Sequence, residues 1–108
     1  MDAEIAEKIH VCTNHGNIQF KKHALVRSVE RSIKIDEIVK VLQNCQIIAI
    51  YAEDKPLKSY LTFGFTKTKR PLHIVVALDE TEKYVWIISA YEPDKKNWNE
   101  TFTKRLKK

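Results

Sequence analysis

The sequence predicts an α+β domain in which a four-stranded antiparallel sheet carries its helices mainly on one face. Two observations lead to this class. Residues 2–44 carry apolar residues at helical spacing, whereas residues 46–91 hold four β-branched and aromatic segments joined by short turns. Strands that follow one another with hairpin-length connections favour an antiparallel meander. Helices grouped before and after the strands are typical of the α+β class.

Three helices are expected before the sheet. The first covers residues 2–15, where Ile5, Ile9 and Cys12 have helical spacing and Gly16 follows as a stop signal. The second covers about residues 22–32, and we expect it to turn four apolar residues towards a core: Leu25, Val26, Val29 and Ile33. The third begins at residue 35 or 36 and ends at 44, and its apolar spacing predicts one buried stripe: Ile35, Ile38, Val39 and Leu42.

Four strands are then predicted, over residues 46–51, 59–65, 72–78 and 83–91. In the third strand the alternation places one set of residues on the core face: Leu72, Ile74, Val76 and Leu78. The other face of that strand carries His73. Gly64, inside the second strand, indicates a bulge or the close approach of another segment. Ile18–Phe20 is expected to be a brief extended segment before the second helix, and a last helix is expected from Asp94 to about Leu106.

The length of 108 residues fits one domain. We expect residues 1–19 to form an N-terminal helix or arm and residues 20–108 a single α+β domain. The longest apolar run, residues 47–51, is too short to span a bilayer, and the acidic start lacks the pattern of a secretory signal. A cytoplasmic protein without a membrane partner is therefore expected, with Cys12 and Cys45 as free thiols.

Metal and cofactor chemistry is not favoured by the motifs. His10, Cys12 and His15 place three potential ligands within six residues, but the spacing fits no standard zinc pattern and no second cluster accompanies it. The sequence also lacks a glycine-rich phosphate loop and a carboxylate cluster suited to magnesium. We therefore expect no metal and no cofactor.

The net charge of +5 is unevenly distributed. Residues 1–54 carry 7 Lys and Arg against 8 Asp and Glu, whereas residues 55–108 carry 12 against 6. A basic half on a small domain favours a polyanionic partner such as RNA, DNA or an acidic protein. A plain solvated surface is the alternative explanation of the same charges.

His23, Arg27 and Arg31 are each four residues apart in the second predicted helix. This spacing places them along one slowly drifting face. A histidine that titrates near neutral pH, beside guanidinium groups that stay charged, suits a site that handles a phosphate. In the alternative interpretation His23 caps its helix, and the two arginines pair with Glu30 and Glu37 on a solvated face.

Three blocks of sequence, taken together, resemble a known family. They are His23-x3-Arg27-x3-Arg31, the segment Arg70-Pro-Leu-His73-Ile-Val-Val-Ala77, and the segment Val85-Trp-Ile-Ile-Ser-Ala-Tyr91-Glu-Pro-Asp94 with Trp98. The set resembles a family of small prokaryotic proteins of unknown function that is similar to the BrnT and RelE/ParE toxins. The resemblance covers about residues 20–98. Ser32 and Lys34 depart from the family, which often has glycine and a small polar residue there; both lie in the turn between helices.

The resemblance implies a RelE/BrnT-like toxin fold and a toxin of a type II toxin–antitoxin pair. Members of the family are often encoded beside an antitoxin of the YgiT/MqsA zinc-finger type, so the implied partners are RNA and such an antitoxin. The implied activity is metal-independent cleavage of RNA. RNA carries its own nucleophile, the 2′-OH, so such an enzyme needs only a base, an acid and cations at the phosphate.

Candidate residues for this chemistry follow. His23 and His73 are the candidate base and acid, and Arg27 with Arg31 would stabilise the phosphate. Tyr91 would supply a proton or stack on a base. A further basic set would steer RNA without sequence preference: Lys67, Lys69, Arg70, Lys104 and Arg105.

The alternative is a non-catalytic module that binds RNA or protein on the same fold. In that case His73 is a satisfied, half-buried histidine, Tyr91 is structural, and Trp86 and Trp98 serve packing. The two readings differ in what His23→Ala does, because only an enzyme has cleavage to lose.

Overall fold

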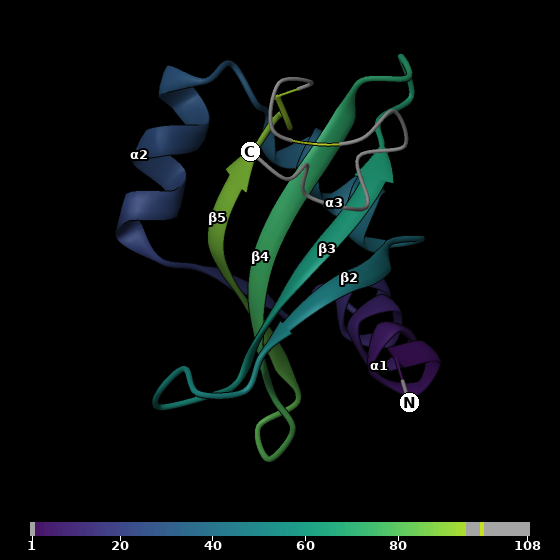
Figure 1. The fold of residues 1–108 in the computed structure, drawn as a ribbon, viewed down its shortest axis with the longest axis vertical. Helices are drawn as coiled ribbons and strands as arrows, with labels where there is room; N and C mark the ends of the chain where they lie inside the picture. The colour runs from purple at the N-terminus through teal and green to yellow at the C-terminus, as the bar shows by residue number, and fades with distance from the viewer. Residues whose placement is uncertain (1, 95–97, 99–108) are drawn as a thin grey trace.

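The computed structural model describes residues 2–94 and 98 of the chain (Figure 1). This part of the chain contains three helices: α1 (Asp2–Asn14), α2 (Lys22–Glu30) and α3 (Ile35–Leu42). It contains five strands: β1 (Ile18–Phe20), β2 (Gln46–Tyr51), β3 (Ser59–Phe65), β4 (Pro71–Asp79) and β5 (Tyr84–Tyr91). The α+β class is confirmed. None of the helices described here is long and apolar enough to cross a membrane.

The sheet has the strand order β1-β5-β4-β3-β2. Strands β2 to β5 form the antiparallel meander that the sequence predicts. The prediction of a four-stranded antiparallel sheet is nevertheless wrong, because β1 adds a fifth strand that runs parallel to β5, with Ile18 opposite Val85. A three-residue segment is too short to show strand periodicity. It pairs because the chain leaving α1 passes along the edge of β5, whose backbone groups would otherwise be unpaired there.

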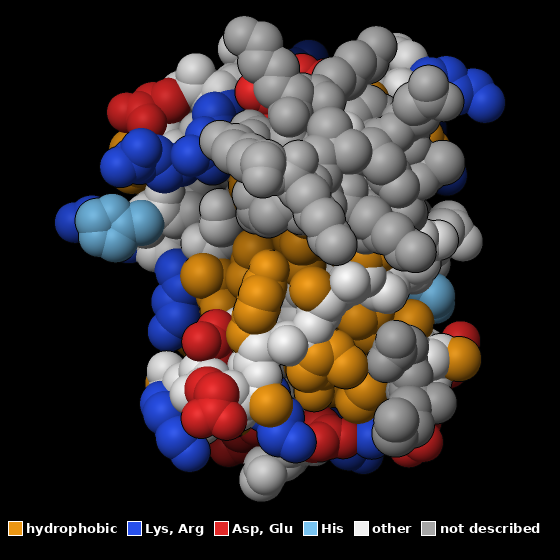
Figure 2. Space-filling view, in the orientation of Figure 1, with side chains coloured by type: hydrophobic (Ala, Val, Ile, Leu, Met, Phe, Trp, Pro, Cys, Tyr) orange, Lys and Arg blue, Asp and Glu red, His pale blue; other side chains and the backbone are white. Residues whose placement is uncertain are grey.

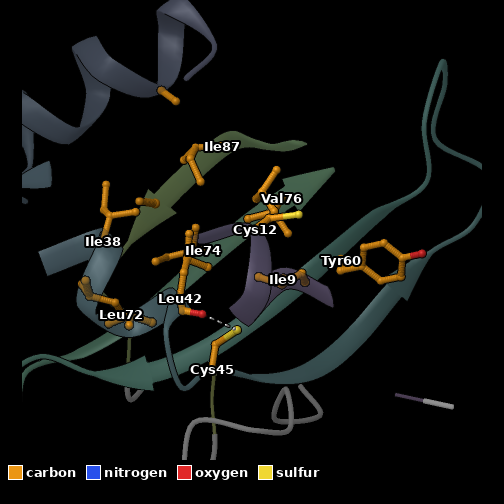
Figure 3. Packing of buried hydrophobic residues seen from close by; sticks show 14 of the residues in the cluster. Ile9, Cys12, Ile38, Leu42, Cys45, Tyr60, Leu72, Ile74, Val76 and Ile87 are labelled. Atoms are coloured by element: carbon orange, nitrogen blue, oxygen red, sulfur yellow. Dashed lines mark hydrogen bonds between the residues drawn. The ribbon is translucent and has the colours of Figure 1, made fainter. Parts of the chain in front are cut away.

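The core lies between the sheet and the two helices α1 and α3, which cover its far face in the view of Figure 1. As predicted, the side chains of Leu72, Ile74, Val76 and Leu78 are buried on this face. Ile9 of α1 and Ile38 of α3 are fully buried against them (Figure 3). Because α1 contributes to the core cluster, the N-terminal helix is packed onto the sheet.

The buried stripe of α3 differs from the predicted one. Ile38 and Leu42 are buried as expected, but Ile35 is 51% exposed, Val39 is half-buried, and Val41 is buried instead. The reason lies in β3. A Cβ atom placed on Gly64 would lie 2.9 Å from Cγ1 of Val41, so the absence of a side chain lets α3 approach the sheet at this point. Of the two alternatives predicted for Gly64, a bulge or a close approach, the structure shows the close approach.

The predicted core face of α2 is largely wrong. Ile33, just after the helix, is buried, but Leu25, Val26 and Val29 are exposed. The helix instead buries the small residues Ala24 and Ser28 beside β5. Periodicity alone favours large apolar residues for the inner face. Here α2 lies beside the upper half of β5 (Figure 1), and the side chains that it buries there are these two small ones.

The opposite face of the sheet carries a second, smaller cluster. Leu61, Phe63 and Trp98 are buried there, with Val75 and Tyr91 packed against them. Figure 2 views this face and shows apolar side chains over its lower half. The predicted last helix, from residue 94 to about 106, lies almost wholly outside the described residues. Within them, the Trp98 amide donates to the Asp94 carbonyl at 3.1 Å.

Candidate functional site

His73 is surrounded by aromatic side chains on the sheet face that carries the smaller cluster with Trp98. Its strand neighbours are Phe63 on β3 and Tyr91 on β5. Its Nδ1 atom is 3.3 Å from the Tyr91 hydroxyl, and its ring meets the Trp98 ring at right angles with centroids 4.4 Å apart. The His73 side chain has 0% exposure. The alternative prediction for His73 is a satisfied, half-buried histidine; the structure gives it polar and aromatic neighbours but buries it completely.

Arg31 follows α2 and reaches the end of β5. Its Nη1 atom donates a hydrogen bond to the Ala90 carbonyl at 2.8 Å. Ala90 directly precedes Tyr91, so the guanidinium group lies at the same end of the strand as the His73–Tyr91 contact. Hydrogen bonds from charged donors are the stronger ones in proteins, and this one joins residues 59 positions apart. Arg31 therefore helps to hold α2 against β5.

Arg70 immediately precedes β4 and connects several elements. It donates to the Ser32 carbonyl at 2.9 Å and to the Arg31 carbonyl at 3.1 Å. It also pairs with Glu37 of α3 and with Glu92 after β5, each at 3.5 Å. The carbonyls follow the end of α2, where unpaired acceptors need donors. The Arg70 guanidinium thus joins the turn after α2 to α3 and β5.

His23 and Arg27 lie on the exposed surface of α2. Arg27 is 3.9 Å from the carboxylate of Glu30, and both side chains are 62% exposed. Exposed pairs of this kind contribute about 0–1 kcal/mol, so the contact leaves Arg27 available to other anions. The alternative interpretation, in which Arg27 and Arg31 pair with Glu30 and Glu37, is met for Glu30, whereas Glu37 pairs with Arg70.

The structure therefore divides the five predicted catalytic residues into two groups. Arg31 donates to the carbonyl of Ala90, next to Tyr91, and His73 contacts the Tyr91 hydroxyl, so these three residues lie near the same end of β5. His23 and Arg27 lie on earlier, exposed turns of α2. A base and an acid must both reach one substrate, within hydrogen-bond distance of the reacting atoms. His73 has no exposed surface while His23 is on the outside, so the two histidines do not share an accessible site in this conformation.

Three of the predicted RNA-steering residues lie at one turn: Lys67, Lys69 and Arg70. Lys67 and Lys69 are exposed in the tight turn between β3 and β4, which hydrogen bonds around Thr66 hold together. A hollow beside this turn is lined by Thr66, Lys67, Thr68, Val39 and Gln43, and by the charged residues Asp36, Glu37 and Lys40 of α3. The carboxylates reduce the local attraction for a polyanion. Lys104 and Arg105 lie outside the described residues.

Sequence reasoning missed a groove at the lower end of the sheet face seen in Figure 2. Trp86, expected in packing, is half-buried and lines this groove with Lys21, Lys55 and Ile88. The Lys21 ammonium lies 4.7 Å from the centroid of the Trp86 ring, a cation–π contact. No local signal indicates this pair, because only the pairing of β1 with β5 brings Lys21 beside Trp86.

The two cysteines are buried free thiols. Burial raises the pKa of Cys45 to about 12, and burial also raises the pKa of Cys12, against a smaller opposite effect of Lys83. Thiols in this state are poor nucleophiles and poor metal ligands. Cys12 donates to the Lys83 carbonyl, while His10 contacts the Cys45 carbonyl at 2.9 Å. In the part of the chain that the structure describes, no group of three or more His, Cys, Asp or Glu side chains could hold a metal ion.

These features define a small α+β protein with a buried histidine–tyrosine contact and an exposed basic helix. The sequence model of the Domain of unknown function (DUF4258) matches residues 20–92, most of the chain, and the chain belongs to this family. The match agrees with the resemblance to a family of unknown function. Comparisons with curated proteins and with solved structures find no match.

Proposed function

We propose that this chain is an RNA-binding protein that holds phosphates on the basic side of α2. The observation that carries the proposal is the exposure of His23 and Arg27, with Lys22 beside them on the same helix. Arg31 and Arg70, by contrast, are engaged in contacts within the protein. Lys and Arg contacts to phosphates supply most of the affinity of binding that does not depend on sequence.

The surface around α2 supports this choice. Figure 2 shows basic and histidine side chains gathered at the left edge of the molecule, where Figure 1 places α2. On the helix itself, Arg27 pairs with Glu30 at 3.9 Å, an exposed contact that a phosphate can replace at little cost. The β3–β4 turn is a weaker candidate, because its lysines lie beside Asp36 and Glu37.

The test is the salt dependence of RNA binding by the full chain. A labelled single-stranded RNA is titrated with protein at several salt concentrations, and binding is followed by fluorescence anisotropy. Lys22→Ala with Arg27→Ala should weaken binding and reduce the slope of log K against log salt by about 1.4, because each single-strand phosphate contact contributes about 0.7. Lys58→Ala, at an exposed lysine outside α2, is the matched control and should leave the slope unchanged.

An unchanged slope in the double variant would contradict the proposal. A DNA of the same sequence serves as the competitor. Equal affinity for RNA and DNA would mean that α2 recognises phosphates alone, whereas a preference for RNA would indicate contacts to the 2′-OH.

The second candidate is a metal-independent ribonuclease, acting as the toxin of a type II toxin–antitoxin pair with a YgiT/MqsA-type partner. The RelE/BrnT-like interpretation of the fold belongs to this candidate. The observation in its favour is that the His73–Tyr91 contact and the hydrogen bond from Arg31 to the Ala90 carbonyl lie at the same end of β5. In this candidate His73 and Tyr91 transfer protons and Arg31 stabilises the phosphate, once the Trp98 side chain has moved off the His73 ring.

Cleavage of labelled RNA in EDTA tests this candidate, with and without translating ribosomes. The wild type should leave a 2′,3′-cyclic phosphate, and His73→Ala should abolish cleavage without loss of RNA binding. His23→Ala separates the two sites, because a site built on His73, Tyr91 and Arg31 alone tolerates it. If nothing is cut under either condition, only the binding function remains.

A further inference from the structure

The outer side of α2 carries a stripe of exposed aliphatic residues, which we name the apolar stripe: Leu25, Val26 and Val29. Their exposed fractions are 40%, 49% and 77%. The buried residues of the same helix are Ala24 and Ser28, so the three aliphatic residues lie outside the face that α2 buries. Single exposed apolar residues are ordinary on protein surfaces, but adjacent ones on one element indicate an interaction site.

The positions of these residues on the helix make the stripe continuous. At about 100° per residue, Leu25, Val29 and Val26 follow one another around about 100° of the helix surface. Lys22 falls among them at the N-terminal end of the stripe. His23 and Arg27 lie on the adjoining side, one step further round. The apolar stripe is therefore bordered by cationic side chains, with Glu30 as the one acidic neighbour on α2.

We propose that the apolar stripe docks an amphipathic helix of an acidic partner protein. Aliphatic residues of the partner would pack on Val26 and Val29, as in helix-in-groove and helix-on-helix recognition. Acidic residues beside them would pair with Lys22 and Arg27. The helix that binds thus needs an apolar face flanked by Asp and Glu.

Charge argues against the two other occupants of this surface. In a two-fold symmetric pair of chains, each α2 would meet the same surface of its copy, so Lys22 and Arg27 would face like charges. The C-terminal segment of this chain is also basic, with Lys104, Arg105, Lys107 and Lys108. Opposite charge, by contrast, steers association and fixes the partner's orientation.

A partner on the apolar stripe would also cover the basic side of α2. Docking and RNA binding should therefore exclude one another. This consequence rests on the proposed RNA-binding function, whereas docking itself does not, so the two are measured separately.

The experiment uses the full chain and two synthetic amphipathic peptides with the same leucine face. One carries glutamates beside that face and the other carries lysines. We expect the acidic peptide to bind at least about 10-fold more tightly, a difference of about 1.4 kcal/mol. Val26→Ser with Val29→Ser should weaken its binding by a further factor of about 10 or more. Ile50→Ser, at a residue of β2 with 47% exposure, is the matched control and should have no effect.

Amide chemical shifts locate the peptide, and circular dichroism confirms that each variant folds. The proposal is overturned if the acidic peptide does not bind, if both peptides bind equally, or if the shifts map away from α2. It is also overturned if sedimentation shows a dimer of the wild type that Val26→Ser with Val29→Ser dissociates. If the chain binds the peptide but no RNA, the proposed function fails and the docking surface stands.

Discussion

The indole ring of Trp98 meets the imidazole ring of His73 edge to face, with centroids 4.4 Å apart and planes at 90°. The two residues are separated by the whole of β5 in the sequence. Trp98 is 8% exposed and His73 fully buried, so one side chain helps to shield the other from water. The Trp98 indole is thus one of the groups that separate the His73 ring from solvent.

Trp98→Ala should therefore expose His73. We expect a faster exchange of the His73 C2 proton with solvent, measured by NMR, and a loss of about 3 kcal/mol in the free energy of unfolding from the lost packing. Trp98→Phe is the control, because it retains an aromatic ring and should keep the exchange slow. An exchange rate that stays at the wild-type value in Trp98→Ala would show that other groups bury His73.

Gly64→Ala should destabilise the domain, because its Cβ would lie 2.9 Å from Cγ1 of Val41 and would push α3 away from β3. Overpacking of this kind costs about 1–3 kcal/mol, measured by urea unfolding. Adding Val41→Ala removes the atom that clashes, so the double variant should lose less stability than the two single changes predict. Simple additivity would mean that the backbone of α3, rather than this side chain, sets the separation.

Arg70→Ala should loosen the turn between α2 and α3. It removes two hydrogen bonds to the Ser32 and Arg31 carbonyls and leaves Glu37 and Glu92 without this cation. We expect a loss of about 2 kcal/mol in stability, because hydrogen bonds to charged groups contribute about 1.5–3 kcal/mol. Amide hydrogen exchange should rise first at Ser32 and Ile33. Arg70→Lys should retain only part of the lost stability, because an ammonium group cannot donate to both carbonyls in the geometry of a guanidinium group.

The thiol of Cys45 should make stability fall at alkaline pH. Burial raises the pKa of Cys45 to about 12 from an ordinary value of 9.0, so above pH 9 the unfolded chain loses this proton while the folded chain keeps it. Stability is fully present below pH 9 and declines as the pH rises towards 12. At pH 10 the loss should be about 1 kcal/mol. Urea unfolding at pH 7 and pH 10 measures it, and Cys45→Ala should reduce the difference between the two values.

A Cys45→Ala protein with the same loss as the wild type would assign the alkaline effect to other groups. Tyr60 is the first candidate among those groups. Burial raises the pKa of its hydroxyl, and the negative charge of Glu80 raises it further.

The strands could be predicted from the sequence, because their patterns are local. The alternation in β4 separates Leu72, Ile74 and Val76 from His73, and the structure keeps that division. The face of α2 could not be predicted. Its periodicity favours Leu25 and Val29 as core residues, but the face of α2 that packs beside β5 consists of Ala24 and Ser28. Nothing in the local pattern says how close that helix lies to β5.

The candidate site shows the same division. The spacing of His23, Arg27 and Arg31 predicts one row on a helix. In the fold, Arg31 donates to the Ala90 carbonyl at the end of β5, whereas His23 and Arg27 lie on earlier turns of α2. The sequence did not indicate that Trp86 would line a surface groove. Its neighbour Lys21 is brought beside it only by the pairing of β1 with β5.

The sequence by itself determined the order of the helices and of strands β2 to β5, and the core face of β4, since each depends on residues that are near one another along the chain. For Gly64 it left a bulge or a close approach open, and the packing of Val41 of α3 decided between them. Tertiary structure decided three other features: the place of β1, the exposed apolar stripe of α2, and the division of the arginines between structural contacts and the surface. These depend on partners that lie far away in the sequence, such as Ala90 for Arg31 and Ser32 for Arg70, and the partners become neighbours only when the chain folds.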